Sequence, residues 1–342
     1  MITSNRALVF VRGLAMAGLL AGGLRAAAPG DAFFGRWALT IPGGGAGWLE
    51  VKQEKGWLDG SILWGGGSVL PVASVTIADG VLPVTRVREV PRKDAAGKVV
   101  RTQQLTETIT ARAEGDALKL TRVAARPNGN GFDRDEFTGK RIPPLPARPN
   151  LAQVKFGAPV ELFNGRDLAG WKLKEPGATN CWSVDRGTLA NRPPPHVAGQ
   201  PQARSGNLRT EREFEDFNLK LEVNVPAGSN SGVYLRGIYE IQVLDSYGKP
   251  LDPHNMGAVY SRIAPALAAE KPAGEWQSLD MTLVDRHVTV VLNGKTIIDN
   301  QPLLGCTGGA MWSDEFRPGP IYLQGDHGAV AFRNLVLRPV QK

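Results

Sequence analysis

Strict alternation of apolar and polar residues is the feature that most constrains the fold of this chain. Over residues 217–225, apolar side chains at odd positions are separated by polar ones at even positions, and residues 279–283 repeat the pattern. Successive side chains of a β-strand point to opposite faces, so this period of two predicts strands with one buried and one solvated face. Asn293-Gly294 favours the positive φ values of a type I′ turn and predicts a hairpin. We therefore expect an all-β second half of two stacked sheets, with one short helix around residues 264–270.

The first half of the chain also consists of short apolar segments separated by turn residues. Gly65-Gly66-Gly67 and Glu114-Gly115-Asp116 mark two of the turns, and no segment shows convincing helical periodicity. This spacing is typical of an antiparallel meander, so we expect a smaller β domain over residues 29–142, a barrel or a sandwich of about eight strands. The proline-rich stretch at 143–158 indicates an extended linker, which places the second domain at 159–342.

The first 28 residues have the pattern of a secretory signal peptide. Arg6 and Arg12 precede an apolar run over residues 13–24, and Ala26-Ala27-Ala28 supplies small residues for cleavage. A helix made of that run would reach only about 18 Å, short of a hydrocarbon core about 30 Å thick, which argues against a membrane anchor. We expect a periplasmic or secreted protein that has no membrane contact once the signal is removed.

Charge and cysteine content narrow the function classes. The formal net charge is +7, yet residues 151–342 carry 20 basic and 20 acidic residues and no aromatic-basic stripe, which argues against a nucleic-acid partner. Cys181 and Cys306 are the only cysteines of the chain. They would pair in an oxidising compartment or remain as two buried free thiols, and the sequence leaves both alternatives open. It leaves the oligomeric state open as well.

Polar side chains concentrate on two neighbouring candidate strands within residues 228–248. Period two places Tyr234 and Arg236 on one face of the first strand, and Glu240 and Gln242 on one face of the second. If the two strands share that face, these four groups line one concave surface. The alternative is an exterior sheet face where the polar groups are merely solvated.

The pattern Glu-x-Gln-x-x-Asp, which begins at Glu240, invites comparison with sandwich glycosidases that place carboxylates along one strand. Such enzymes need two carboxyl groups about 5 to 5.5 Å apart for a retaining mechanism. Here the position two residues on is Gln242, an amide that can neither attack nor exchange a proton. Asp245 belongs on the opposite face unless a bulge intervenes. Hydrolysis by two carboxylates is therefore disfavoured unless another strand supplies the partner.

A second polar cluster lies near the C-terminus, within residues 319–335. Tyr322 and Gln324 share a face, and Asp326 and His327 follow in a glycine-bracketed turn. A histidine beside an aspartate in such a turn is a general base, a metal ligand or an ordinary loop residue. The chain has no His-x-x-x-His and no paired-cysteine motif, which argues against a structural zinc site.

Several of these motifs occur together and in order. They are ELFNGRDLAGW (161–171), SGNLRTEREFEDFNLKLE (205–222), NSGVYLRG (230–237), YEIQVLDSYG (239–248), GAVYSRIAP (257–265), AGEWQSLDMTL (273–283), LNG (292–294) and GPIYLQGDHGAVAFRNL (319–335). Over about 156–340 the chain thus resembles the 3-keto-disaccharide hydrolase family, a former domain of unknown function. The resemblance implies a jelly-roll sandwich similar to concanavalin A and laminin-G domains, and action on glycosides oxidised at C3. Gly325 interrupts the family's usual Leu-Gln-Asp-His string, and residues 29–150 lie outside the resemblance.

The implied chemistry needs one base, one acid and an enolate stabiliser, because a C3 carbonyl acidifies the hydrogen on C2 and permits β-elimination at C1. We expect Glu240 as base, His327 or Tyr260 as acid and Arg236 as stabiliser. A divalent metal ion held by Glu240, Asp245 or His327 is an alternative stabiliser, although no ligand spacing of its own marks the sequence. No other cofactor is expected.

The expected site therefore contains two sets of residues, and the ligand is a carbohydrate. The catalytic candidates are Glu240, His327, Arg236 and Asp245, and the substrate-binding candidates are Gln242, Tyr234, Tyr260, Trp276, Gln324 and Trp182, the two tryptophans as stacking platforms. A non-catalytic carbohydrate-binding module is the alternative function, since the same fold serves both. A scaffold that binds only other proteins is a third hypothesis. The density of ionisable side chains favours the enzyme.

Overall fold

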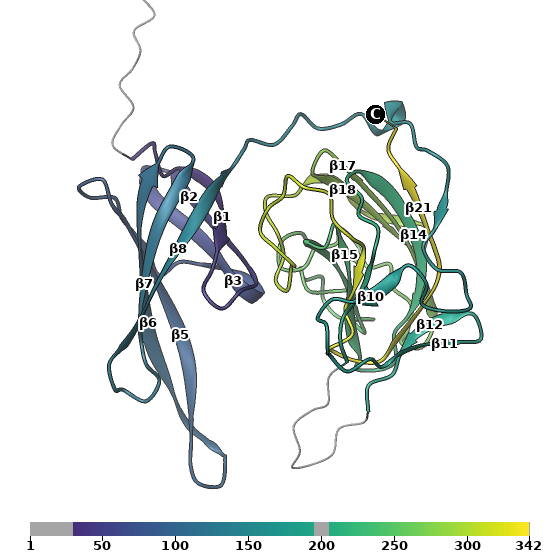
Figure 1. Ribbon diagram of the computed structural model, residues 1–342, viewed down its shortest axis with the longest axis horizontal. Coiled ribbons are helices and arrows are strands. Elements are labelled where there is room, and N and C mark those ends of the chain that lie inside the picture. The colour runs from purple at the N-terminus through teal and green to yellow at the C-terminus, as the bar shows by residue number, and fades with distance from the viewer. Residues whose placement is uncertain (1–29, 195–204, 342) are drawn as a thin grey trace, which may run out of the picture.

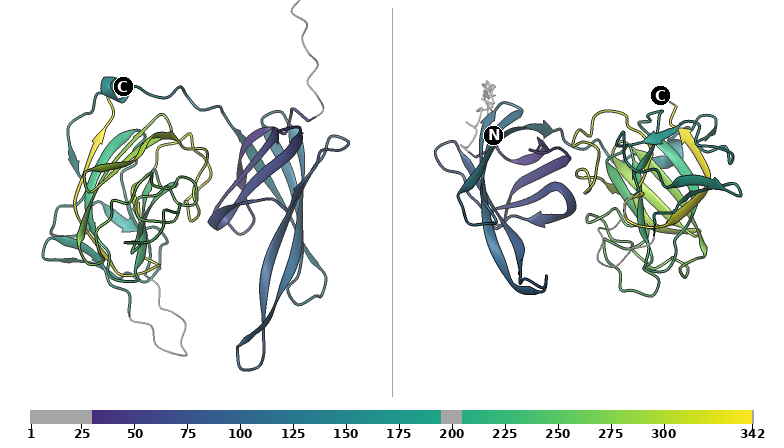
Figure 2. Two further views of the ribbon diagram at one scale, coloured as in Figure 1. Left: turned by 180° about the vertical axis from the view of Figure 1, so that it is seen from behind. Right: turned by 60° about the horizontal axis from the view of Figure 1, so that its bottom comes forward.

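A computed structural model describes residues 30–194 and 205–341 of the chain. Within these ranges the regular structure is all-β, apart from one 3₁₀ turn, η1 (Leu151–Gln153). The strands form two groups that lie side by side and are joined by an extended segment (Figures 1 and 2). The expected signal peptide, residues 1–28, lies outside the described residues. No helix in the described ranges is long and apolar enough to span a bilayer.

The first group is one antiparallel sheet of eight strands in the order β3-β2-β1-β8-β7-β6-β5-β4. It curls around a core that includes Trp37, Leu49 and Ile109. Of the two arrangements expected, it is nearer the barrel, but no ladder joins its end strands β3 and β4, so it remains a half-barrel. The strands are β1 (Gly35–Thr40), β2 (Ala46–Glu54), β3 (Trp57–Pro71), β4 (Ser74–Val75), β5 (Leu82–Lys93), β6 (Val99–Glu114), β7 (Ala117–Ala125) and β8 (Phe132–Ile142).

The second group is a sandwich of two antiparallel sheets, as expected. One sheet has the order β10-β13-β20-β15-β16, and the other has the order β11-β12-β21-β14-β17-β18-β19, with β9 beside β21. The strands are β9 (Val160–Glu161), β10 (Trp171–Leu173), β11 (Trp182–Asp185), β12 (Thr188–Asn191), β13 (Leu208–Thr210), β14 (Phe217–Asn224), β15 (Asn230–Leu235), β16 (Tyr239–Leu244), β17 (Trp276–Val284), β18 (His287–Leu292), β19 (Lys295–Pro302), β20 (Tyr322–Leu323) and β21 (Val330–Pro339).

Local sequence signals explain much of the sandwich. In β14 the apolar positions are buried and the polar positions between them are not, as the period of two predicts. Asn293 and Gly294 have φ values of 50° and 78° and join β18 to β19, which confirms the hairpin. The expected helix around 264–270 is wrong. That segment runs along the sandwich instead, and the Ala266 amide donates to the Ile297 carbonyl rather than to a preceding turn.

The two groups of strands touch directly. Ser313 Oγ accepts a hydrogen bond from the Gly47 amide and donates one to the Leu39 carbonyl, both at 2.8 Å. The Arg262 guanidinium lies 4.4 Å from the centre of the Trp48 ring, a cation–π contact across the same junction. The division into domains at 29–142, 143–158 and 159–342 stays a prediction, but the halves are packed against one another.

Both cysteines are free thiols, which decides between the two alternatives that the sequence left open. Cys306 is fully buried at the junction, and desolvation raises the pKa of its thiol to about 12. Cys181 is partly exposed.

A matched pair of substitutions tests the two faces of β14. Leu219 is fully buried, so Leu219→Ala should lower the free energy of unfolding by about 2 to 5 kcal/mol through lost burial and an unfilled cavity. Its neighbour Lys220 faces solvent, with Nζ 2.9 Å from Asp280 Oδ2, so Lys220→Ala should change that free energy by less than about 1 kcal/mol. Urea unfolding of both variants measures the difference, and equal losses would contradict the assigned faces.

Candidate functional site

A pocket of about 300 Å³ opens on the face of the five-stranded sheet that points away from the sandwich core. Three adjacent strands, β20, β15 and β16, build its floor with alternate side chains that share this face. The floor residues are Tyr322 and Gln324 from β20 and its end, Asn230 and Tyr234 from β15, and Glu240 and Gln242 from β16.

The register between strands brings the central groups together. Tyr234 lies directly opposite Glu240 on one side and Tyr322 on the other, and the two tyrosine rings stack with centroids 4.1 Å apart. Gly232 lies opposite Gln242, and a Cβ at position 232 would collide with Glu240 Oε1. The Glu240 carboxyl therefore lies across β15 at a place that only glycine leaves open.

Burial dominates the electrostatics of Glu240. Its side chain is 3 % exposed, and desolvation raises its pKa to about 8, with a further increase from the charge of Asp326. The hydrogen bond from Tyr234 acts in the opposite direction and lowers this pKa. Tyr234 itself has a pKa well above its ordinary value, because it is desolvated and lies beside Glu240, so it stays a neutral donor.

The Tyr234 hydroxyl stands between two acceptors. Its oxygen is 2.7 Å from Glu240 Oε2 and 2.7 Å from the Gly308 carbonyl oxygen. A hydroxyl has one hydrogen, so it donates to the carboxylate when Glu240 is ionised. When Glu240 is protonated, the carboxyl can donate to Tyr234, which then donates to Gly308. Both protonation states of Glu240 therefore have a hydrogen-bonded arrangement, as a group that exchanges protons requires.

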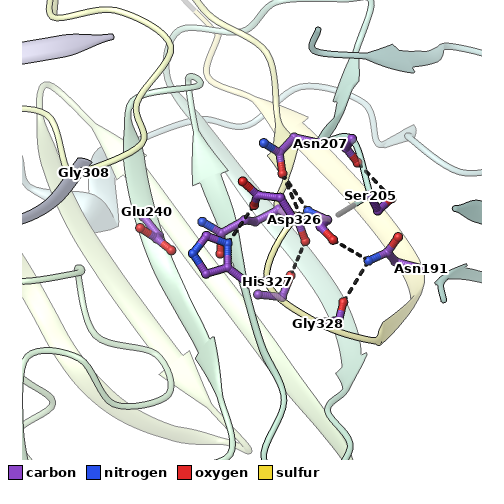
Figure 3. Close-up of polar contacts among 12 residues, drawn as sticks. Asn191, Ser205, Asn207, Glu240, Gly308, Asp326, His327 and Gly328 are labelled. Carbon is purple, nitrogen blue, oxygen red and sulfur yellow. Dashed lines mark hydrogen bonds and ion pairs between the residues drawn. The ribbon is translucent and has the colours of Figure 1, made fainter. Parts of the chain in front are cut away.

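The turn that carries Asp326 and His327 is held in place at the pocket rim (Figure 3). Asn207 Oδ1 accepts from the Gly325 amide at 2.7 Å, and the Asn191 side-chain amide donates to the carbonyls of Gly325 and Gly328. His327 Nδ1 lies 2.7 Å from Asp326 Oδ1. Because Gly325 has no side chain, the backbone of the turn packs closely against its neighbours. Asp326 and His327 still line the pocket.

Six of the ten expected site residues line this pocket. They are Glu240, His327, Gln242, Tyr234, Tyr260 and Gln324. The other four do not, and each has a structural reason.

Arg236 and Asp245 lie beyond the ends of their strands. Arg236 has a φ of 55°, so the backbone has left the extended conformation and the period of two no longer holds. Its guanidinium is buried elsewhere and donates to the carbonyls of Glu315 and Arg317. Asp245 Oδ2 accepts from the Gly228 amide and closes the strand end. The expectation that Arg236 shares the pocket with Glu240 is therefore wrong.

The two tryptophans have structural roles. Trp182 is 4 % exposed, donates its indole N–H to the Gly206 carbonyl at 2.8 Å and stacks on Phe332. Trp276 belongs to β17 of the other sheet, where the Arg333 guanidinium lies 4.0 Å from its ring centre. Neither ring offers a stacking surface to a ligand in the pocket.

Sequence reasoning missed several lining residues. Asn230 and Tyr322 could have been predicted from the sequence, because Asn230 shares a strand face with Tyr234 and Tyr322 shares one with Gln324. Lys174 had no local signal. Its Nζ is 2.6 Å from Glu175 Oε1 and 5.4 Å from the Tyr322 ring centre, and all three line the pocket.

The donor set of the pocket suits hydroxyl groups better than a metal ion. Asn230 and Gln324 line the pocket with side-chain amides, which both donate to and accept from hydroxyl groups, and their amide oxygens have no hydrogen-bond partner. Across the described ranges, no three His, Cys, Asp or Glu side chains gather in a metal-binding arrangement. Asp245 lies outside the pocket, so the three donors named for a divalent ion are not brought together.

The raised pKa of Glu240 predicts a pH-dependent stability. A carboxyl with a pKa of about 8 in the folded chain, against an ordinary 4.5, stabilises the fold below pH 4.5 and loses this contribution as the pH rises through 8. Relative to Glu240→Gln, the wild-type free energy of unfolding should fall by up to about 5 kcal/mol across that window. Chemical unfolding of both proteins from pH 4 to 9 measures this, and parallel curves would show that the carboxyl titrates normally.

Comparison with known proteins adds to this geometry. No curated protein matches the chain. Among solved structures, two candidate glycosyl hydrolases from Parabacteroides distasonis are similar. One is 28% identical over 58% of this chain and 93% of its own, with a TM-score of 0.44, and the other is 21% identical over 54% and 94%, with a TM-score of 0.43. The carbohydrate-binding module CBM66 of Bacillus subtilis is 13% identical over 48% and 93%, with a TM-score of 0.31.

The sequence model of one protein family matches residues 158–338, which is more than half of the chain and contains the whole sheet that carries the pocket floor. That family is described as the 3-keto-alpha-glucoside-1,2-lyase-like domain. The protein therefore belongs to the 3-keto-alpha-glucoside-1,2-lyase-like family.

Proposed function

We propose that this protein cleaves the glycosidic bond of sugars already oxidised at C3, by proton removal at C2, elimination at C1 and addition of water. The observation that most supports this is Glu240, a buried carboxyl with a pKa of about 8 on the floor of a polar pocket. A carboxylate of that proton affinity is a much stronger base than an ordinary glutamate, while a useful fraction is still ionised near neutral pH.

The C3 carbonyl makes the hydrogen on C2 acidic, so a single base can start the reaction. The Glu240 carboxylate takes this proton, and the electron pair of the C2–H bond forms the enolate of the ketone. The enolate then forms a C1=C2 double bond as the C1–O bond breaks, and the departing oxygen receives a proton from the acid. Water adds across the double bond, with oxygen at C1 and hydrogen at C2, and gives the free 3-keto sugar.

The remaining roles fall to residues of the same pocket. His327, oriented by Asp326, or Tyr260 supplies the acid. Lys174 replaces Arg236 as the cation that stabilises the enolate, because it is a lysine of the pocket wall while Arg236 is buried elsewhere. The side-chain amides of Asn230 and Gln324 hydrogen-bond sugar hydroxyls and orient the ring.

One observation favours a second candidate function. Asp326 is a second carboxylate on the pocket, and its charge contributes to the raised pKa of Glu240. A buried carboxyl with a raised pKa beside a second carboxyl group also suits ordinary glycoside hydrolysis, in which Glu240 is the acid that protonates the leaving group. The two mechanisms demand opposite protonation states of Glu240.

The pH dependence of the reaction separates these mechanisms. If Glu240 is the base, kcat/KM for a 3-keto disaccharide should rise with pH and level off above about 8, because the carboxylate is the active form. Tyr234→Phe removes the hydrogen bond that lowers this pKa, so the rising limb should move to higher pH. Initial rates from pH 5 to 10 measure both profiles. A limb that falls with an apparent pKa near 8 would assign Glu240 as an acid.

Loss of the ionisable group should abolish turnover without loss of binding. Glu240→Gln keeps the volume of the side chain, and we expect kcat for a 3-keto disaccharide to fall by about 10²- to 10⁴-fold. Glu161→Gln makes the same change at an exposed position of β9 and should leave kcat unaltered. The rate of each protein on the 3-keto disaccharide is compared with its rate on a non-oxidised disaccharide and with its rate in the presence of a chelator. A wild-type protein that binds these sugars but turns over none of them would be a carbohydrate-binding module.

We also propose that the protein acts in the periplasm or outside the cell. Residues 1–28 support this through their arginines, apolar run and small residues. N-terminal sequencing of the exported protein would find the mature chain beginning near residue 29, and an unprocessed N-terminus would oppose the proposal.

A further inference from the structure

The first sheet, which lies outside the family domain, contributes to the wall of the pocket. Gly66 and Gly67 of β3 line the cavity together with Glu240 and Tyr234 of the sandwich. Strands β1 to β3 are on the side of the first sheet that faces the sandwich in Figures 1 and 2. The pocket is therefore built from two parts of the chain that are far apart in sequence.

At the pocket wall, backbone atoms of the two parts contact one another directly. The Gly309 amide donates to the Gly65 carbonyl at 3.1 Å, and a Cβ at position 308 would collide with the backbone of Gly67. Gly308 is also the residue whose carbonyl accepts from Tyr234. The β3 glycines thus pack against Gly308, whose carbonyl accepts from Tyr234, and Tyr234 in turn hydrogen-bonds to the Glu240 carboxyl.

A second contact fixes the other side of the same wall. Ser68 Oγ lies 2.8 Å from His254 Nε2, and Asp252 Oδ1 lies 2.6 Å from Nδ1 of the same imidazole. The His254 ring packs edge-on against Tyr260, a pocket residue, with ring centres 4.9 Å apart. Ser68, which follows the β3 glycines, therefore contacts the loop that carries Tyr260, a candidate acid.

We propose that the first sheet closes one end of the pocket and makes this an end-acting site for short glycosides. This inference rests on the proposed function and adds the size of the substrate. A volume of about 300 Å³ is at the lower end of small-molecule pockets, so it accommodates a short sugar rather than the interior of a polysaccharide chain. The β3 glycines are part of the cavity wall, so we expect them to block a longer chain on that side.

Gly66 offers a direct test, because it lines the cavity and has no left-handed φ, and no atom lies within 4 Å of an added Cβ. Gly66→Trp should fill the cavity without backbone strain and lower kcat/KM for a 3-keto disaccharide by at least about tenfold, mainly through KM. Gly66→Leu should show a smaller loss of kcat/KM, and it replaces Gly66→Trp in the test if that variant does not fold. Thr102→Trp, at an exposed position of β6, is the control and should stay within about twofold of wild type.

Wild-type rates on a 3-keto disaccharide and on a tetrasaccharide oxidised at an internal unit complete the experiment. We expect the internal unit to be cleaved at least about tenfold more slowly. Equal rates on both substrates, or Gly66 variants that match wild type, would overturn the inference while the proposed function stands. If wild type turns over neither substrate, the proposed function fails. Calorimetric titration with unoxidised disaccharide then decides the inference alone, since only a β3 wall makes Gly66→Trp weaken binding.

Discussion

The pairing of β15 with β16 is the interaction on which the site depends. It sets Tyr234 opposite Glu240 and Gly232 opposite Gln242, so the polar groups of two strands meet on one face. A slip of one residue in this register would turn Glu240 into the hydrophobic core and Ile241 toward the pocket. The hydrophobic positions on the core face, which include Val233, Leu235 and Ile241, exclude that alternative because each is fully buried. The core thus fixes the chemistry of the opposite face.

A second buried carboxyl shows why location, and not burial alone, marks Glu240. Glu315 is 1 % exposed and has a raised pKa through desolvation, and it accepts a hydrogen bond from Tyr239 much as Glu240 does from Tyr234. The charges of Arg286, Arg262 and Arg236 oppose that increase in the pKa of Glu315. Glu315 lies near these arginines and lines a different cavity, together with Arg236 and Arg286. In the part of the chain that the structure describes, no arginine charge opposes the raised pKa of Glu240, and its cavity also contains Asp326 and His327.

The sequence predicted those parts of the fold and site that follow from local periodicity. Alternation identified β14, the Asn293-Gly294 turn placed a hairpin, and the face shared by Glu240 and Gln242 was found from spacing alone. The rule failed at Arg236, because a left-handed residue at a strand end breaks the period. The stacking role expected of Trp182 and Trp276 was wrong for another reason, since an aromatic residue fits a core as well as a sugar. Lys174 and Gly66 reach the pocket through tertiary contacts, which no local pattern records.

The glycine contact between β3 and the loop at Gly308 also has a consequence for the order of folding. A chain made from its N-terminus forms the first sheet early, but the carbonyl that accepts from Tyr234 belongs to a loop synthesised near the end. Until that loop docks, the Glu240 carboxyl is less desolvated, so its pKa lies closer to that of an exposed glutamate. The strong base therefore exists only in the fully assembled protein, and an incompletely folded chain carries a chemically ordinary residue at this position.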